Sequence, residues 1–348
     1  MIGVRWALGL CLVLVVGCRT AEPAPAEGGA PIAHSPAETA SSPRGADTTS
    51  PPLDATASTP STPPAPSETA SPSTSRAGTG GSSTAERLPT PTHDLTPFRG
   101  QHVYAGLPVA ASGAEYTLLE NLGFVVGYSE SRKNPLWVAF RLEGGVAHEA
   151  GKRPGRFKVD ERTQARVSHE DYKQRDYQRD PQAYDRGHMA PNHAIATRYG
   201  REAQLETFLM SNICPQRKTL NQQTWAALER TIAGVWAEDC GEVWVVVGPI
   251  FGEAPERLNG VSQIPAAFYA LVLDEEAGAP RVVAAVMTQE VSGKQPLAPF
   301  VTTVDAVEAA TALDFFADLP DDLEAWLVVS QPDARWGLDH PLGATRPR

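Results

Sequence analysis

Four consecutive residues, Asp185 to His188, carry side chains suited to cutting a phosphodiester bond. The imidazole of His188 has an ordinary pKa of about 6.5, so it accepts a proton from water at neutral pH. The guanidinium of Arg186 presents a planar fork that matches two phosphate oxygens. Gly187 is expected to permit a turn, and Asp185 to orient a neighbour or cap that turn. Alone this is weak evidence, because most adjacent His and Arg residues are surface groups.

A second set of candidates lies on one predicted helix. Apolar residues recur at helical spacing and predict an amphipathic helix over 221–237. Asn221 and Glu229 are eight residues apart, which is about 2.2 turns, so both side chains should point to nearly the same face. Amide and carboxylate oxygens suit a Mg²⁺ ion that keeps most of its waters. The alternatives are that Asn221 caps the helix N-terminus and that Glu229 lies on a solvated face.

The elements around these residues do not alternate regularly between strand and helix. Strands are predicted over 136–142, 242–247, 266–273 and 281–287, and a near period of two also runs through 115–126. A short helix or turn is expected over 202–210, an irregular segment over 156–184, and a helix from Thr303. This order favours an α+β domain with a mixed, mainly antiparallel sheet flanked by helices over a doubly wound sheet.

The N-terminal third has a different composition. Residues 1–18 resemble a bacterial signal peptide that ends in a lipobox, with Cys18 as the lipidated residue, and their apolar run is too short to span a bilayer. An ordinary secretory signal is the alternative. Residues 19–95 are rich in Pro, Ser and Thr and predict a disordered linker. The folded domain is expected over 96–348, exported and either lipid-anchored to the bacterial envelope, periplasmic or secreted.

Charge and cysteine content leave two questions open. The net charge is −11, but residues 151–230 hold 15 basic and 10 acidic side chains, so this stretch carries +5 and the rest −16. Such a stretch attracts a polyanion only modestly, and an ordinary solvated surface is the alternative. Cys214 and Cys240 flank the predicted helix, and the sequence does not decide between a disulfide and two free thiols.

These segments together resemble the DNA/RNA non-specific endonuclease family, which includes secreted bacterial nucleases and mitochondrial endonuclease G. The resemblance rests on the string 185–188, on Asn212-Ile213-Cys214-Pro215-Gln216, and on Leu220-Asn221-Gln222 with Trp225 and Glu229 following. It extends from about Tyr116 to Leu327, which is most of the predicted domain. The resemblance implies a ββα-metal (His-Me finger) nuclease fold and hydrolysis of both DNA and RNA.

The resemblance also implies roles for individual residues. His188 would be the general base, and Asn221 the only direct protein ligand of one Mg²⁺ or Mn²⁺ ion. Glu229 would hold waters bound to that metal. Arg186 and Arg156 would contact the phosphate, while Asn212 would support the geometry of the site.

Other functions remain as alternatives at this stage. One is a catalytically inactive, nucleic-acid-binding surface lipoprotein of the same fold. Another is a metallohydrolase with a different substrate, which the lack of a His/Asp-rich cluster disfavours. His169 and His193 are interpreted as surface residues, and base stacking is the less favoured role for Tyr172, Tyr177 and Tyr184. An inhibitor protein, the oligomeric state and any preference between DNA and RNA stay open.

Overall fold

The computed structural model describes residues 93–111, 115–293, 295–332, 336–338 and 342. The expected signal peptide, Cys18 and nearly all of the expected linker lie outside the described residues. Two described residues before the expected boundary at residue 96 also contact the domain, because the His93 amide donates to Gly278 O at 3.1 Å and Leu95 is buried. None of the helices in the described ranges is long and apolar enough to cross a membrane.

A seven-stranded sheet forms the centre of the domain, and every neighbouring pair of its strands is antiparallel. Its order is β12-β11-β10-β7-β4-β3-β2. The strands are β2 (Thr117–Glu120), β3 (Val125–Ser129), β4 (Asn134–Glu143), β7 (Glu242–Ile250), β10 (Ala267–Glu276), β11 (Ala279–Thr288) and β12 (Val301–Thr302). The four predicted strands are confirmed, and the period-two stretch 115–126 contains β2 and the start of β3.

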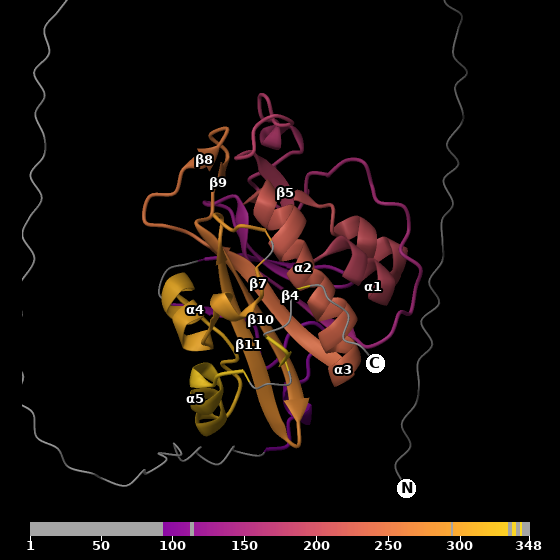
Figure 1. The fold of residues 1–348 in the computed structure, drawn as a ribbon, viewed down its shortest axis with the longest axis vertical. Helices are drawn as coiled ribbons and strands as arrows, with labels where there is room; N and C mark the ends of the chain where they lie inside the picture. The colour runs from indigo at the N-terminus through magenta and orange to yellow at the C-terminus, as the bar shows by residue number, and fades with distance from the viewer. Residues whose placement is uncertain (1–92, 112–114, 294, 333–335, 339–341, 343–348) are drawn as a thin grey trace, which may run out of the picture. The chain divides into compact units, whose positions relative to one another are not determined.

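Both faces of this sheet are buried, which accounts for the unbroken apolar run in β7. Val243, Val245 and Val247 contribute to one hydrophobic cluster, whereas Trp244 and Val246 contribute to the other. Successive side chains of a strand point to opposite faces, so a strand covered on both sides is apolar throughout. The helices of residues 192–240 lie on one side of the sheet, and α4 (Val304–Thr311) and α5 (Asp321–Val329) lie on the other (Figure 1).

The predicted helix over 221–237 is confirmed and is slightly longer, from 218 to 240. It is helical throughout but changes its winding along its length. The segments are the π-helical η4 (Leu220–Trp225), α2 (Ala226–Thr231), the π-helical η5 (Ile232–Trp236) and α3 (Ala237–Cys240). We refer to residues 218–240 as the site helix.

The remaining helices follow local sequence signals. The Thr303 hydroxyl accepts the amide of Ala306 at 3.2 Å and begins α4 as predicted. The expected short helix or turn over 202–210 is the end of α1 (Asn192–Glu206) followed by a 3₁₀ turn, η3 (Met210–Asn212). The expected irregular segment 156–184 contains one further 3₁₀ turn, η2 (Glu170–Tyr172). Short strand pairs β1 (Val109–Ala110) with β13 (Leu313–Asp314), and β8 (Arg257–Leu258) with β9 (Ser262–Gln263), complete the domain.

The last described residues return to the site helix. The ring of Trp336 packs edge-to-face on Trp236 with centroids 5.1 Å apart, and Trp236 Nε1 donates to Trp336 O at 3.0 Å. The two cysteines of the described residues are both free, Cys214 buried and Cys240 partly buried at the end of α3. Of the two alternatives for this pair, the structure shows free thiols.

Candidate active site

Two short strands and the site helix carry most of the candidate residues. β5 (Tyr184–His188) pairs antiparallel with β6 (Ile213–Arg217), and the site helix begins directly after β6. This is a ββα unit packed on the central sheet. Gly187 lies inside β5 and not in a turn as expected. A side chain there would place its Cβ 2.4 Å from Gln216 Oε1, so the glycine provides space for a buried neighbour.

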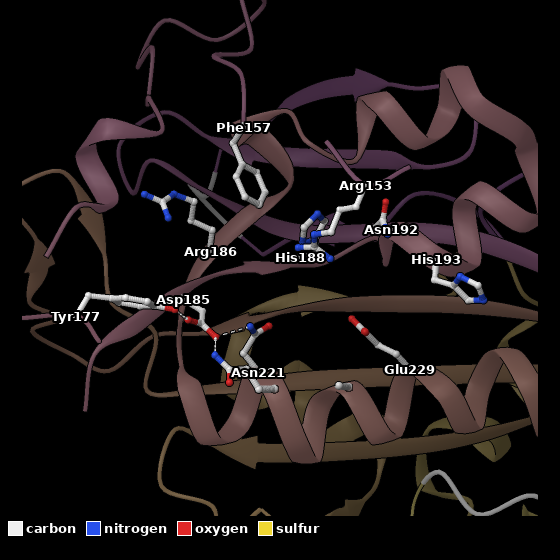
Figure 2. Close-up of a pocket in the computed structure, with 12 residues that line it drawn as sticks. Arg153, Phe157, Tyr177, Asp185, Arg186, His188, Asn192, His193, Asn221 and Glu229 are labelled. Atoms are coloured by element: carbon white, nitrogen blue, oxygen red, sulfur yellow. Dashed lines mark hydrogen bonds between the residues drawn. The ribbon is translucent and has the colours of Figure 1, made fainter. Parts of the chain in front are cut away.

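A cavity of about 560 Å³ opens between β5 and the site helix (Figure 2). It brings together five predicted site residues, namely Asp185, Arg186, His188, Asn221 and Glu229. It is also lined by Arg153, Phe157, Tyr177, Asn192, His193, Gln222 and Ala226. The predicted residues Asn212 and Arg156 do not line it.

His188 is the last residue of β5 and is almost completely buried. Its ring centroid lies 5.2 Å from that of Phe157 and 4.9 Å from that of Phe208. Burial, and secondly the charge of Arg153, lower the pKa of His188 to about 3. The imidazole is therefore neutral at physiological pH, and its Nε2 has no hydrogen-bond partner among the described residues. A neutral imidazole with an uncommitted nitrogen is able to accept a proton.

The amide of Asn221 is oriented by Asp185. Asn221 Nδ2 donates to Asp185 Oδ2 at 2.7 Å, and Gln222 Nε2 donates to the same oxygen at 2.9 Å. With its nitrogen engaged, Asn221 turns its oxygen away from Asp185, toward the side of the cavity where Glu229 lies (Figure 2). The alternative that Asn221 caps the helix is wrong, because the helix begins at residue 218.

Glu229 points into the same cavity from two turns further along (Figure 2). In an α-helix eight residues exceed two turns by about 0.2 turn. The π-helical winding of η4 uses more residues per turn and brings the offset closer to two whole turns. Burial raises the pKa of the Glu229 carboxyl to about 8, and the charges of Arg153 and Arg230 only partly oppose this. A nearby cation would stabilise the ionised carboxylate.

These donors fit a hydrated divalent cation. The Asn221 amide and the Glu229 carboxylate supply hard oxygen atoms on one wall of the cavity, and Mg²⁺ retains several of its waters in such sites. Within the part of the chain that the structure describes, no group of three or more His, Cys, Asp or Glu residues is arranged to hold a metal.

Of the two arginines predicted to contact the phosphate, Arg186 lines the cavity and Arg156 does not. Arg156 has a 70% exposed side chain and pairs with Glu170 at 2.7 Å. Arg153, three residues earlier, lines the cavity instead, packs over the Phe208 ring at 5.2 Å, and lies close enough for its charge to affect the pKa values of His188 and Glu229. Arg156 therefore lies outside this cavity, and its contact with the phosphate stays a prediction. Residues 151–158 are irregular, so no periodicity distinguishes one arginine from the other.

Arg186 lines the cavity but turns its guanidinium away from Asn221 and Glu229 (Figure 2). One of its terminal nitrogens donates to His169 O at 2.8 Å, while its Nε is buried without a partner among the described residues. Burial lowers the pKa of this guanidinium. The ring of Phe157 thus lies between the Arg186 guanidinium and His188 in Figure 2.

Asn212 lies outside the cavity, and its side chain bonds to the backbone of two other segments, at Ala190 and at Thr207. Its Oδ1 accepts the Ala190 amide at 2.8 Å, and its Nδ2 donates to Ala190 O and Thr207 O, both at 3.0 Å. The side chain is fully buried. These bonds join the start of β6 to the residues that follow His188.

Comparison with known proteins agrees with this architecture. The sequence model of the family described as DNA/RNA non-specific endonuclease matches residues 105–322. A mitochondrial nuclease of Saccharomyces cerevisiae is 29% identical over 57% of this chain, and a nuclease of Serratia marcescens is 32% identical over 41% of it. The aligned regions span 64% and 54% of those two relatives, respectively.

A solved structure supports the same fold. A chain of the crystal structure of the EndoG/EndoGI complex superposes with a TM-score of 0.52 at 23% sequence identity, covering 69% of this chain and all of that one. The α+β fold with a ββα-metal unit, expected from the sequence, is confirmed. Because the family's sequence model covers more than half of the chain and the fold agrees, this protein belongs to the DNA/RNA non-specific endonuclease family.

Proposed function

We propose that this protein is a Mg²⁺-dependent, sugar-nonspecific endonuclease that hydrolyses phosphodiester bonds in DNA and RNA. The observation that carries the proposal is that His188, Asn221, Glu229 and Arg153 line a single cavity. Membership in the family supports a nucleic-acid substrate. The catalytically inactive lipoprotein has no observation in its favour, because each of these groups is present and faces the cavity.

In this mechanism His188 removes a proton from the attacking water. The apolar surroundings that lower its pKa keep the imidazole neutral and ready to accept that proton. An isolated imidazole with so low a pKa is a weak base. A phosphate that enters the cavity brings negative charge, which favours the imidazolium form and strengthens the base when substrate is bound.

Asn221 would hold the metal through its amide oxygen, and Glu229 would hold waters of the metal. When bound, Mg²⁺ (or Mn²⁺) supplies positive charge that stabilises the leaving 3′ oxygen. Asp185 keeps the amide nitrogen of Asn221 engaged, so that the oxygen stays available. The raised pKa of Glu229 is consistent with a carboxylate placed to interact with a cation.

Arg153 is the arginine best placed to stabilise negative charge on the phosphate. In the described part of the chain it forms no ion pair within 4 Å, whereas Arg156 is already paired with Glu170. Arg186 would contact a neighbouring phosphate from the far side of Phe157. Contacts confined to phosphate predict little selectivity among bases.

The proposal includes export through the signal at residues 1–18 and a lipid anchor on Cys18. Its support comes from the sequence, and mass analysis of the mature N-terminus tests it. An unmodified Cys18 in the mature chain would exclude the anchor. A mature chain that begins after Cys18 would likewise be a secreted or periplasmic enzyme without a lipid.

The decisive experiment incubates plasmid DNA and a structured RNA with the full chain, first with Mg²⁺ and then with an excess of chelator. Cleavage of both substrates with Mg²⁺, and its loss with the chelator, is expected. His188→Ala serves as the matched inactive variant. Nucleic-acid binding without cleavage under Mg²⁺ or Mn²⁺ would reject the enzyme and favour the inactive binding protein.

A further inference from the structure

We infer that Tyr177 is a positioning residue, which holds Asp185 so that Asn221 presents its amide oxygen to the metal. The inference rests on the proposed function, since it gives Tyr177 a part in building the same site. Tyr177 belongs to the irregular segment before β5, and its hydroxyl donates to Asp185 Oδ1. Figure 2 shows the phenol pointing at Asp185 from the side opposite Asn221.

The two oxygens of Asp185 divide their partners between two parts of the chain. Oδ1 accepts from Tyr177, and Oδ2 accepts from the amides of Asn221 and Gln222. A carboxylate bonded on one oxygen only is less restrained about its Cβ–Cγ bond than one bonded on both. The phenol holds the second oxygen, so Oδ2 remains directed at the Asn221 nitrogen. If the amide reversed, its NH₂ group would face the cation site, and an amide nitrogen is not a metal ligand.

Tyr177 is itself fastened to the start of the site helix. The Lys218 ammonium lies 4.0 Å from the centre of the Tyr177 ring and donates to Tyr177 O, and also to Asp180 O at 3.1 Å. Lys218 is the first residue of the site helix. The phenol, the carboxylate and the helix start therefore form one connected unit around the Asn221 amide.

The same contacts argue against base stacking by Tyr177. One ring face is already covered by Lys218, and the hydroxyl donates to Asp185. Burial, and secondly this hydrogen bond, raise the pKa of Tyr177 to about 12. Tyr184 is a matched comparison. It is partly buried and its ring lies under Arg217 at 4.6 Å, but its hydroxyl forms no hydrogen bond with any described residue.

The test is direct Mn²⁺ binding to the full chain without nucleic acid, measured by calorimetry and by electron paramagnetic resonance of free Mn²⁺. Tyr177→Phe removes only the hydroxyl, and a hydrogen bond of this kind contributes about 0.5–1.5 kcal/mol. We expect the Mn²⁺ dissociation constant to rise roughly two- to tenfold. Cleavage at saturating Mn²⁺ should stay near the wild-type rate, because the hydroxyl touches no reacting atom. Tyr184→Phe should change neither quantity.

A double variant makes the test specific. In an Asn221→Ala background the amide is gone, so Tyr177→Phe should weaken Mn²⁺ binding no further. Melting curves confirm that each variant is folded. If the wild type binds Mn²⁺ and cleaves DNA but Tyr177→Phe binds Mn²⁺ equally well, the inference is wrong and the proposed function stands. If the wild type neither binds Mn²⁺ nor cleaves, both are wrong. The inference would also be wrong if Tyr177→Phe weakened Mn²⁺ binding by the same factor in the Asn221→Ala background as in the wild type.

Discussion

The imidazole of His188 meets the ring of Phe208 edge-on, with the two centroids 4.9 Å apart. Phe157 packs on the same imidazole with a centroid distance of 5.2 Å. An apolar environment of this kind disfavours the charged form of histidine. The candidate base is thereby kept neutral by its packing, while the groups proposed to bind the metal lie on a separate element, the site helix.

His188→Ala should lower the turnover of plasmid DNA by about 10²- to 10⁴-fold, the range usual for removing a general base. Affinity for DNA should stay close to that of the wild type, because the imidazole carries no charge that holds the phosphate. The control is His193→Ala, an exposed histidine that lines the same cavity. Gel-based cleavage and a filter-binding assay give the two quantities, and full turnover by His188→Ala would mean that the base is another group.

Asn221→Ala should sharply raise the Mg²⁺ concentration needed for half-maximal cleavage, because it removes the proposed direct ligand. Gln222→Ala is the matched control. Its amide donates to the same oxygen of Asp185, at 2.9 Å, yet is not proposed to bind metal. A Mg²⁺ titration of initial rates compares the two. An unchanged titration for Asn221→Ala would remove it as the ligand.

Arg153→Ala and Arg156→Ala form a second matched pair, at two positions three residues apart in one irregular segment. A charged hydrogen bond to the phosphate is worth about 1.5–3 kcal/mol, so Arg153→Ala should reduce kcat/KM by roughly 10- to 150-fold. Arg156→Ala loses only an exposed pair with Glu170, and its effect should be slight. A larger loss of kcat/KM in Arg156→Ala than in Arg153→Ala would assign the phosphate contact to Arg156 and contradict the role proposed for Arg153.

The stability of the metal-free protein should fall as pH rises from about 6.5 to 8. Burial raises the pKa of Glu229 to about 8, above its ordinary value of about 4.3 in the unfolded chain. The folded protein therefore keeps a proton that the unfolded chain has lost, so rising pH favours unfolding up to about pH 8. His188 has the opposite shift, and its contribution increases only until its unfolded pKa of about 6.5 is passed.

Chemical denaturation at several pH values measures the free energy of unfolding, which should fall by roughly 1–2 kcal/mol between about pH 6.5 and 8. Glu229→Gln should abolish the decline, whereas Glu202→Gln, a change of an exposed carboxyl on α1, should preserve it. Saturating Mg²⁺ should also remove the decline, since a bound cation favours the carboxylate. A decline of equal size in Glu229→Gln would assign the effect to other groups.

Much of the fold was predictable because its signals are local. The runs that became β7, β10 and β11 are apolar and bounded by turns, and the apolar spacing of the site helix is regular. The ββα unit was predictable only through the family resemblance, since β5 is short and polar in sequence. Its strand character comes from pairing with β6, a contact between segments about thirty residues apart.

The cavity brings together the predicted site residues on β5 and on the site helix, whereas Arg156, on an irregular segment, lies outside it. Asn221 and Glu229 share a helix, so their spacing in the sequence alone indicated a common face. The π-helical winding that improves their alignment was not predictable from the sequence. Arg153 and Tyr177 reach the cavity from irregular segments, where the direction of a side chain depends on tertiary contacts. Gly187 was assigned to a turn because glycine often marks turns, and its true constraint is the volume of Gln216 across the strand pair.

The contact between Trp236 and Trp336 has a practical consequence for anyone who expresses this protein. The indole of Trp236 belongs to η5 of the site helix, and its hydrogen bond ends on residue 336. Trimming the chain at residue 332 would remove the residue that packs on that indole and accepts its hydrogen bond. Affinity tags and surface tethers are therefore better attached before residue 93.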